Sequence, residues 1–172
     1  RGLGDVYKRQ ILFTHDLHSH FLPQSTAEGG ESGGYARLKT VIDRERAVNP
    51  DALLVDGGDF SIGSLIQTLY TTQAAELRTM GAMGYDAVTI GNHEFDYGYE
   101  QLMLNMAKAN FQVLCANVSK DGKSIFDANT IIEKGGMKIG FFGLETPEAQ
   151  TKANPALIQG LTFLGAKDMY AA

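Results

Sequence analysis

The feature that most constrains the fold of this chain is a strict alternation of short apolar runs with segments whose apolar residues recur at helical spacing. Three apolar runs, at 11–14, 52–55 and 86–90, are each followed by such a segment, and a fourth run at 112–115 closes the series. Strands that alternate with helices form parallel sheets joined by right-handed crossovers, so the sequence predicts an α/β domain. Ligands of such sheets bind beyond the carboxyl ends of the strands.

Helical spacing and turn residues predict the other elements. Helices are expected at 35–48, 65–80 and 99–106, where apolar side chains recur every three to four positions. After Asn117 the pattern changes, because apolar runs at 130–133 and 138–143 flank a Gly-Gly pair, which predicts a β-hairpin. A last short strand is expected at 161–164.

Composition narrows the classes of protein that this alternation permits. The chain has 172 residues, of which 44% are hydrophobic and 20% charged, so it can bury the core of one globular domain. No apolar run approaches the roughly 20 residues of a membrane helix, and we expect no membrane segment. A net charge of −5 excludes nucleic acid as the main partner. The single cysteine, Cys115, excludes an internal disulfide and a Cys-rich zinc module.

Neither end of the chain has the features of a natural terminus. Residues 1–10 carry neither an initiator Met nor the apolar core of a signal peptide, and part of this segment resembles a translated sequencing adapter. We therefore expect residues 1–10 to be an artefact. Residues 166–172 read as the start of a helix that stops without a cap, so we expect residues 11–172 to be the N-terminal part of a truncated domain.

Each of the first three apolar runs leads into a polar cluster, and a parallel sheet would bring the three clusters to one edge. The clusters are Asp16-Leu17-His18, Gly58-Asp59-Phe60-Ser61-Ile62-Gly63 and Gly91-Asn92-His93-Glu94. In an extended segment Asp16 and His18 share a face, which suits metal ligation. The carboxylate of Asp59 can bridge two cations, and Asn92 offers a neutral oxygen ligand. The predicted metal ligands are Asp16, His18, Asp59 and Asn92.

His93 follows a predicted ligand but is expected to face the substrate. Neighbouring side chains of an extended backbone point to opposite sides, so His93 and Asn92 should not reach the same metal. Asp96, expected at the start of the next helix, would accept a hydrogen bond from the imidazole and favour its charged form. His93 and Asp96 are therefore the predicted catalytic dyad.

Each cluster alone also has an ordinary structural explanation. Asp59 could cap the helix that follows it, and Asp96 could be a plain acidic residue in the first turn of a helix. Three polar clusters at the ends of successive strands are improbable as unrelated turns, so the site is the favoured interpretation.

Four neighbouring residues are given other roles. Alternation turns His15 away from Asp16, and His20 is expected to line the loop or the substrate entrance. Asp56 is expected to satisfy backbone donors at a strand end. Glu94 is expected to do the same or to orient a metal ligand.

The three motifs together resemble a known family. Asp16-x-His18, Gly58-Asp59-x-x-x-Gly63 and Gly91-Asn92-His93-Glu94 are similar to the first three signatures of calcineurin-like metallophosphoesterases. Within that superfamily, residues 14–21 and 91–98 are most similar to bacterial 5′-nucleotidases and cyclic-nucleotide phosphodiesterases. The resemblance implies a layered αββα sandwich, here incomplete, with two divalent metal ions that can be Zn, Mn or Fe. The implied site has Asp16 and His18 on one ion, Asp59 bridging, Asn92 on the other ion, and His93 and Asp96 as the catalytic dyad.

The implied activity is hydrolysis of a small-molecule phosphoester, in the first place a nucleoside 5′-monophosphate, by attack of a metal-activated hydroxide in the full-length parent. A cyclic-nucleotide phosphodiesterase, a sugar-nucleotide hydrolase and a non-catalytic metal-binding or scaffold domain stay open as alternatives. The family pattern continues with further histidines and a C-terminal substrate-binding domain, but no histidine follows His93. We therefore expect this chain by itself to be inactive or nearly so. By resemblance, we expect the parent to be exported.

Overall fold

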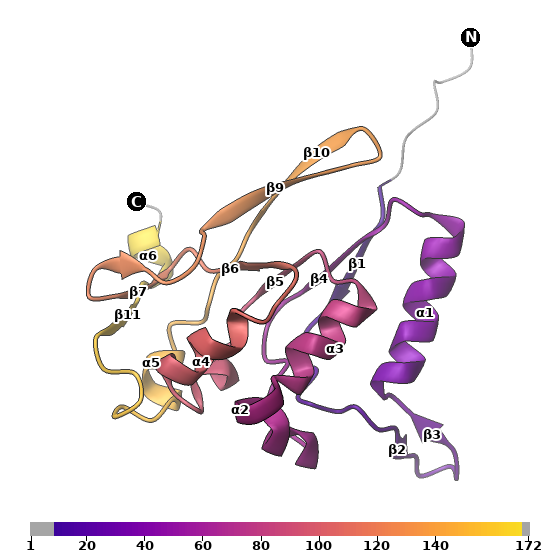
Figure 1. Ribbon diagram of the computed structural model, residues 1–172, viewed down its shortest axis with the longest axis horizontal. Helices are drawn as coiled ribbons and strands as arrows, with labels where there is room; N and C mark the ends of the chain where they lie inside the picture. The colour runs from indigo at the N-terminus through magenta and orange to yellow at the C-terminus, as the bar shows by residue number, and fades with distance from the viewer. Residues whose placement is uncertain (1–8, 170–172) are drawn as a thin grey trace.

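The computed structural model describes residues 9–169 and contains the predicted parallel sheet. Its strands are β1 (Ile11–Thr14), β4 (Leu53–Asp56), β5 (Ala87–Thr89) and β6 (Gln112–Leu114), in the order β1-β4-β5-β6. Each neighbouring pair is parallel, so the four carboxyl ends lie at one edge of the sheet (Figure 1). The predicted alternation of strands and helices is confirmed in this part of the chain.

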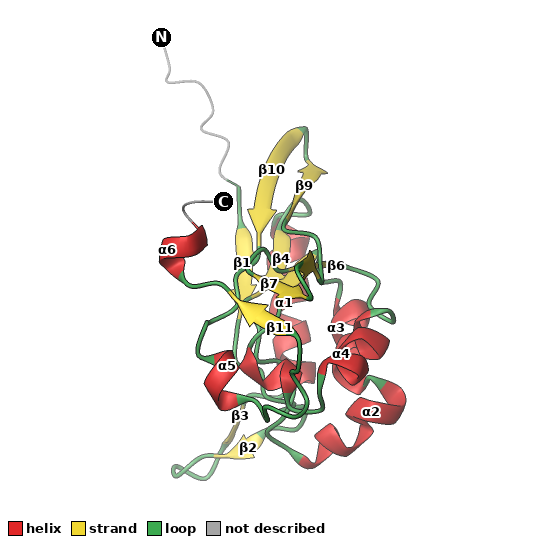
Figure 2. Cartoon of the chain, turned by 90° about the vertical axis from the view of Figure 1, so that its left-hand side faces the viewer, coloured by secondary structure: helices red, strands yellow, loops and turns green. Residues whose placement is uncertain are grey.

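Three helices cover one face of this sheet, as Figures 1 and 2 show: α1 (Tyr35–Val48), α3 (Ala75–Met83) and α4 (Tyr99–Met106). Their apolar side chains pack against the central strands. The core residues at this contact, each exposed by 3% or less, are Ile42, Leu54, Leu77, Met80, Val88 and Leu102. Full burial of one such aliphatic side chain stabilises the fold by roughly 1.5–3 kcal/mol.

The prediction of one helix over residues 65–80 is wrong in its first half. Residues 65–80 are not one helix but η1 (Leu65–Leu69), α2 (Tyr70–Gln73) and the start of α3. Ala74 separates α2 from α3. Its backbone is left-handed, with φ 46°, and its N–H donates to the Tyr70 carbonyl in the last hydrogen bond of α2. The apolar spacing was misleading, since Leu65 is 88% exposed and packs on no core.

Two hairpins follow β6, of which one was predicted. β9 (Asn129–Lys134) and β10 (Met137–Phe142) pair antiparallel around Gly135 and Gly136, both with positive φ. β7 (Val118–Lys120) and β8 (Lys123–Ser124) pair around an Asp-Gly turn, a hairpin signal that is present in the sequence but was not predicted from it. The predicted last strand is β11 (Leu161–Phe163), which pairs with β7.

The remaining elements are short. They are β2 (Gln24–Ser25), β3 (Glu31–Ser32), η2 (Asn92–Phe95), α5 (Ala149–Lys152) and α6 (Ala166–Met169). The first two pair antiparallel in the loop between β1 and α1. Between residues 9 and 169, none of the helices combines the length and the apolar character needed to cross a membrane.

The expected artefact at residues 1–10 falls largely outside the described residues. Its last two residues are described and contact the domain. Arg9 pairs with Asp51 at 3.2 Å, and the Gln10 amide donates to Glu45 at 2.7 Å. The boundary at residue 11 therefore stays a prediction.

A partly buried ion-pair network ties α1 to the edge between α3 and β5. The Arg46 guanidinium donates to the carbonyls of Met83 and Gly84 at the end of α3 and lies 3.3 Å from Asp86. The same carboxylate accepts from the Leu54 amide in β4 at 2.8 Å. Because burial removes the competing water, each lost bond leaves an unsatisfied group inside the protein.

Asp86→Ala is expected to lower the free energy of unfolding by about 1–3 kcal/mol, since it leaves the Leu54 amide without its acceptor and removes the carboxylate that pairs with Arg46. Asp43→Ala is the matched control, because Asp43 pairs with Lys39 on the exposed face of α1. Its loss should cost about 0.5 kcal/mol or less. Urea unfolding of both variants measures the difference, and equal losses would contradict the role given to the network.

Candidate metal centre

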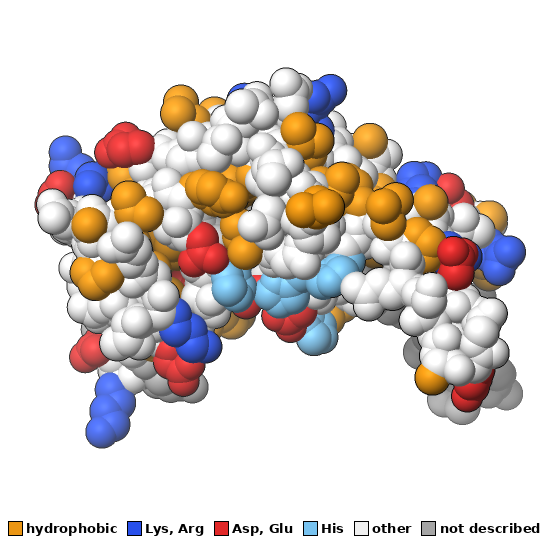
Figure 3. All heavy atoms as spheres, turned by 90° about the horizontal axis from the view of Figure 1, so that it is seen from below, with side chains coloured by type: hydrophobic (Ala, Val, Ile, Leu, Met, Phe, Trp, Pro, Cys, Tyr) orange, Lys and Arg blue, Asp and Glu red, His pale blue; other side chains and the backbone are white. Residues whose placement is uncertain are grey.

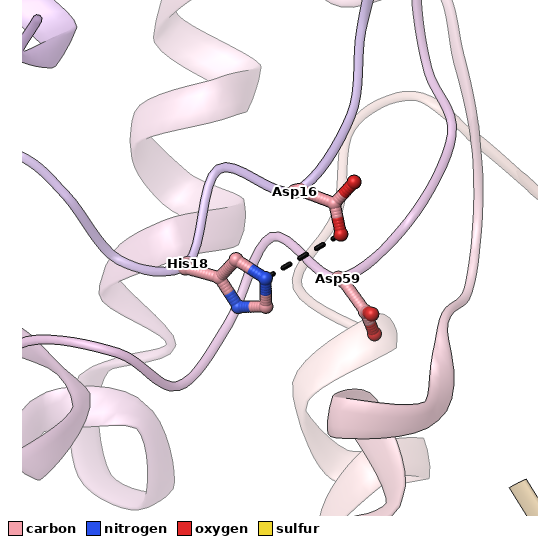
Figure 4. A group of neighbouring side chains, drawn as sticks. All are labelled: Asp16, His18 and Asp59. Carbon is pink, nitrogen blue, oxygen red and sulfur yellow. Dashed lines mark ion pairs between the residues drawn. The ribbon is translucent and has the colours of Figure 1, made fainter.

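Two of the predicted clusters lie side by side because the loops after β1 and β4 continue the pairing of their strands. The amide of Asp16 donates to the Gly58 carbonyl at 3.0 Å, and the amide of His18 donates to the Asp59 carbonyl at 3.0 Å. These loops therefore run past the carboxyl edge of the sheet as a pair. The side chains of Asp16, His18 and Asp59 are carried to one point by this pairing (Figure 4).

The three side chains form a compact donor group. One ligand atom from each of Asp16, His18 and Asp59 lies within 4.8 Å of the other two. Nε2 of His18 is 3.4 Å from Oδ1 of Asp16, the pair marked in Figure 4. In Figure 3 histidine side chains gather in the hollow on the underside of the molecule, with acidic side chains beside them. The side chains of Asp16 and His18 are 54% and 28% exposed, so these donors are open to a ligand from solvent.

The extended conformation expected for Asp16 and His18 is wrong, although the predicted neighbours do meet. Asp16, His18 and Asp59 have φ values of 50°, 44° and 55°, in the left-handed region. A left-handed non-glycine residue costs roughly 1–2 kcal/mol. The paired loops hold these residues in place, and such strain concentrates at functional sites. It is this local turn, and not strand alternation, that points Asp16 and His18 toward each other.

The hydrogen bonds of His18 suit it as a metal ligand. Its Nδ1 lies 3.0 Å from the carbonyl oxygen of Ile62, which can only accept, so Nδ1 carries the proton. Nε2, which faces Asp16, is then the ring nitrogen left for a metal ion. A ligating histidine in proteins commonly donates its second N–H to a carbonyl in this way. An imidazole nitrogen and two carboxylates form a donor set that fits Zn, Mn or Fe.

The third cluster approaches the same point from the loop after β5. The His93 amide donates to Oδ1 of Asp59 at 2.9 Å. Residues 92–95 form η2 and are not extended, so the alternation argument that separated Asn92 from His93 is wrong. Asn92 is half-buried and lies between Gly91 and His93, both of which contact Asp59. The cluster is therefore beside the donor group, as predicted.

His93 and Asp96 form the predicted pair. Nδ1 of His93 donates to Oδ2 of Asp96 at 2.7 Å, and the His93 ring lies edge-on to the His18 ring with centroids 5.2 Å apart. Partial burial opposes the charged imidazole, but the hydrogen bond to Asp96 and the nearby carboxylates outweigh it and raise the pKa of His93. Asp96 follows η2 and precedes α4, so it is not in the next helix as expected.

Glu94 is a fully buried clamp between two of the loops, one of the two roles predicted for it. Its carboxylate accepts from the amides of Asp59, Ser61 and Gly91 at 2.9, 3.0 and 2.6 Å, and from the Ser61 hydroxyl at 2.7 Å. Burial raises the pKa of Glu94 to about 7, against the effect of these donors. Glu94 thus fixes the backbone of Asp59 relative to that of Gly91.

The expectation that His15 points away from Asp16 is wrong. Nδ1 of His15 contacts Oδ2 of Asp16, because the left-handed turn at Asp16 ends the alternation of β1. This hydrogen bond lowers the pKa of Asp16, which keeps its carboxylate charged. Asp56 accepts from the Gly58 amide at 2.8 Å, as predicted. His20 lines a cavity of about 550 Å³ beside Asp16, consistent with its predicted place near an entrance.

Gly91→Ala is expected to disturb the centre, because a Cβ at this position would overlap the carboxylate and the amide nitrogen of Asp59. Overpacking of this kind costs about 1–3 kcal/mol. Gly140→Ala is the control, since a Cβ there meets nothing within 4 Å. Thermal unfolding followed by circular dichroism should show a lower melting temperature for Gly91→Ala and an unchanged one for Gly140→Ala. A Gly91→Ala variant as stable as Gly140→Ala would contradict the close packing of these loops.

Glu145 is a buried acid near this edge of the sheet that the sequence interpretation missed. Glu145 follows β10 and is 2% exposed, and neither of its carboxylate oxygens has a hydrogen-bond partner among residues 9–169. Burial, helped by the charges of Glu94 and Asp59, raises its pKa to about 9. An acidic residue beside Gly143 and Leu144 carries no pattern that predicts its burial.

Glu145 gives the fold a pH dependence with a defined sign. The pKa of Glu145 is about 9 in the folded protein and 4.5 in the unfolded chain. Its contribution to the free energy of unfolding is therefore complete below pH 4.5 and is lost as the pH rises toward 9. Between pH 6 and pH 8 the free energy of unfolding of the wild type should fall by about 2–3 kcal/mol more than that of Glu145→Gln, because glutamine does not titrate. Urea unfolding at both pH values measures this, and parallel pH profiles would contradict it.

Comparison with known proteins identifies the family of this chain. A sequence profile described as calcineurin-like phosphoesterase matches residues 9–163. A 5′-nucleotidase of Vibrio cholerae serotype O1 is 37% identical over 169 residues, which is 95% of this chain and 30% of that protein. A 5′-nucleotidase of Homo sapiens is 33% identical over 165 residues, which is 87% of this chain and 28% of that protein. The chain thus spans less than a third of these relatives.

Solved structures agree as well. A 5′-nucleotidase precursor from Thermus thermophilus has a TM-score of 0.82 and 29% identity, over 94% of this chain and 33% of that one. The Thermus thermophilus sulfate thiohydrolase SoxB shares the fold at a TM-score of 0.84 and 19% identity, over 99% of this chain and 41% of that one. The predicted α/β metallophosphoesterase fold is therefore confirmed. Since the matching profile runs from residue 9 to residue 163 and includes all three loops of the site, the chain belongs to the calcineurin-like phosphoesterase family.

Proposed function

We propose that this chain is the N-terminal part of a metal-dependent phosphoester hydrolase that acts on nucleoside 5′-monophosphates. The observation that carries the proposal is the donor group of Asp16, His18 and Asp59, with donor atoms within 4.8 Å of one another, beside the His93–Asp96 pair. Carboxylates and a neutral imidazole bind divalent cations, and a charged imidazole next to them can act on a phosphoryl group.

Each residue has a defined part in this proposal. Asp16 and His18 would hold one ion, Asp59 would be shared, and Asn92 would hold the other. When bound, a pair of divalent cations supplies Lewis-acid stabilisation of the negative charge that develops on a phosphoryl group. Glu94 holds the Asp59 backbone in place through its bond to the Asp59 amide.

His93 would contribute a proton or a positive charge at its free nitrogen. Asp96 accepts a 2.7 Å hydrogen bond from Nδ1–H of His93, which leaves Nε2 to face the substrate. The raised pKa of His93 increases its charged fraction near neutral pH, as either role requires. General acid catalysis of this kind contributes typically about 10²–10⁴-fold.

The nucleotide is proposed from the relatives, several of which are named 5′-nucleotidases. A cyclic-nucleotide phosphodiesterase or a sugar-nucleotide hydrolase on the same site is the alternative. The residues that recognise the nucleoside would lie in the part of those relatives that this chain does not span. By the same similarity we propose that the longer protein is exported.

We also propose that residues 11–172, without further ligands, turn over slowly or not at all. All four histidines occur by residue 93, so the described centre offers one imidazole within its donor group. A centre with few ligands binds metal weakly, because affinity follows the number and geometry of the donors. On its own this chain would then be a weak metal-binding domain.

The test is hydrolysis by this chain and by a longer protein that contains it, each with added Mn²⁺. Adenosine 5′-monophosphate and bis(p-nitrophenyl) phosphate are the two substrates. We expect the longer protein to release phosphate from the monoester and this chain to be at least about 10²-fold slower. If only the diester is hydrolysed, the proposed activity would be that of a phosphodiesterase and not that of a nucleotidase. No metal-dependent hydrolysis by the longer protein would refute the proposed function.

A further inference from the structure

A buried hydrogen bond lies behind the metal centre and has no part in the ligand set. The Ser19 hydroxyl donates to Oε1 of Glu76 at 2.6 Å, and both residues are 0% exposed. Ser19 directly follows His18, whereas Glu76 lies in the first turn of α3, 57 positions later. The bond therefore joins the loop of the centre to a helix of the core.

Ser19 itself is held in a strained conformation. Its φ is 52°, next to a φ of 44° at His18, so two consecutive residues without a glycine lie in the left-handed region. Four bonds hold Ser19 there: its amide donates to Phe60, its carbonyl accepts from the Phe21 amide and the Ser64 hydroxyl, and its hydroxyl donates to Glu76. Of these, only the bond to Glu76 reaches a long core helix.

Packing alone does not explain an acidic side chain at position 76. A buried carboxylate costs free energy unless its oxygens are satisfied. Oε2 of Glu76 has no hydrogen-bond partner among residues 9–169. Leucine would fill a similar volume without this cost, so the advantage of Glu76 must lie in the acceptor that it offers to Ser19.

We infer that Glu76 is a positioning residue of the metal centre, which orients His18 by anchoring the hydroxyl of Ser19. The inference rests on the proposed metal centre, to which Glu76 contributes no ligand. His18 is fixed by its bond to Ile62 on the ring side and by Ser19 on the chain side. With the anchor removed, the strained turn is free to relax, and Nε2 of His18 turns away from Asp16.

Three variants of this chain test the inference. Glu76→Leu removes the acceptor, whereas Glu76→Gln keeps an amide oxygen that can accept from Ser19. Leu77→Ala is the control for general destabilisation, because Leu77 is fully buried in the same helix and belongs to the hydrophobic core. The first readout needs no metal: the imidazole and backbone-amide NMR resonances of His18. The second readout is the affinity for Mn²⁺, measured by water proton relaxation.

We expect Glu76→Leu to shift the His18 resonances and to weaken Mn²⁺ binding about 10–100-fold, as loss of a partner behind a ligand typically does. Glu76→Gln should restore both, and Leu77→Ala should lower the melting temperature with His18 unchanged. Unshifted His18 resonances in Glu76→Leu, or equal shifts in Leu77→Ala, would overturn the inference. If the wild type binds no Mn²⁺ while the resonances behave as expected, the metal centre is refuted and the positioning role stands.

Discussion

Replacing His93 by alanine in the longer protein is expected to lower kcat about 10²–10⁴-fold while leaving the bound metal almost unchanged. The reason is the geometry of the pair: His93 bonds Asp96 through Nδ1 at 2.7 Å and is not among the residues of the donor group. The substitution removes a proton donor without removing a ligand. Steady-state kinetics with adenosine 5′-monophosphate and metal analysis of the same samples measure the two effects separately.

His15→Ala is the matched control for this prediction. His15 also lies beside the centre, where it contacts Asp16, but its side chain is 63% exposed and is assigned no part in turnover. Its loss should change kcat only a few fold, whereas Asp96→Asn should resemble His93→Ala in part, because it weakens the charged form of the imidazole. A His93→Ala enzyme within a few fold of the wild type, or one that has lost its metal, would refute the dyad.

Glu94→Ala is expected to lower the free energy of unfolding by about 3–5 kcal/mol. It leaves a cavity and removes the acceptor of three backbone amides and the Ser61 hydroxyl, all in the loops that carry the site. Few single substitutions cost so much, because few remove several buried bonds together.

Two further variants show whether the loss comes from the clamp. Glu94→Gln keeps the shape of the side chain and one accepting oxygen, so it should lower the free energy of unfolding by less than Glu94→Ala does. Glu133→Ala removes an exposed glutamate of β9 and should stay within about 0.5 kcal/mol of the wild type. Urea unfolding of the three variants at one pH gives the comparison. A Glu94→Ala loss as small as that of Glu133→Ala would contradict the clamp.

Much of the fold follows from periodicity. The runs at 11–14, 52–55, 86–90 and 112–115 correspond to the four parallel strands. The two central strands, β4 and β5, are largely buried, which is why their runs are continuously apolar. The segment 65–80 could not be predicted in the same way. Its apolar residues keep the helical spacing, but the turn at Ala74 and the exposure of Leu65 depend on the packing of the rest of the chain.

The sequence predicted that the three clusters meet, but not the geometry in which they do so. Topology alone brings Asp16, His18 and Asp59 together, because parallel strands share their carboxyl edge. Alternation failed for Asp16 and His18 and for Asn92 and His93, since their loops adopt left-handed and 3₁₀ conformations that the sequence does not specify. The supporting carboxylate of Glu76 was invisible to sequence reasoning for a simpler reason: its partner Ser19 is 57 positions away.

The most direct test of the metal centre is a crystal structure of this chain grown with Mn²⁺ and measured for anomalous scattering. An anomalous peak in contact with Asp16, His18 and Asp59 is the predicted result. Asp59→Ala should remove that peak, because Asp59 is the ligand assigned to both ions. A peak bound only elsewhere on the molecule, or an unchanged peak in Asp59→Ala, would contradict the account.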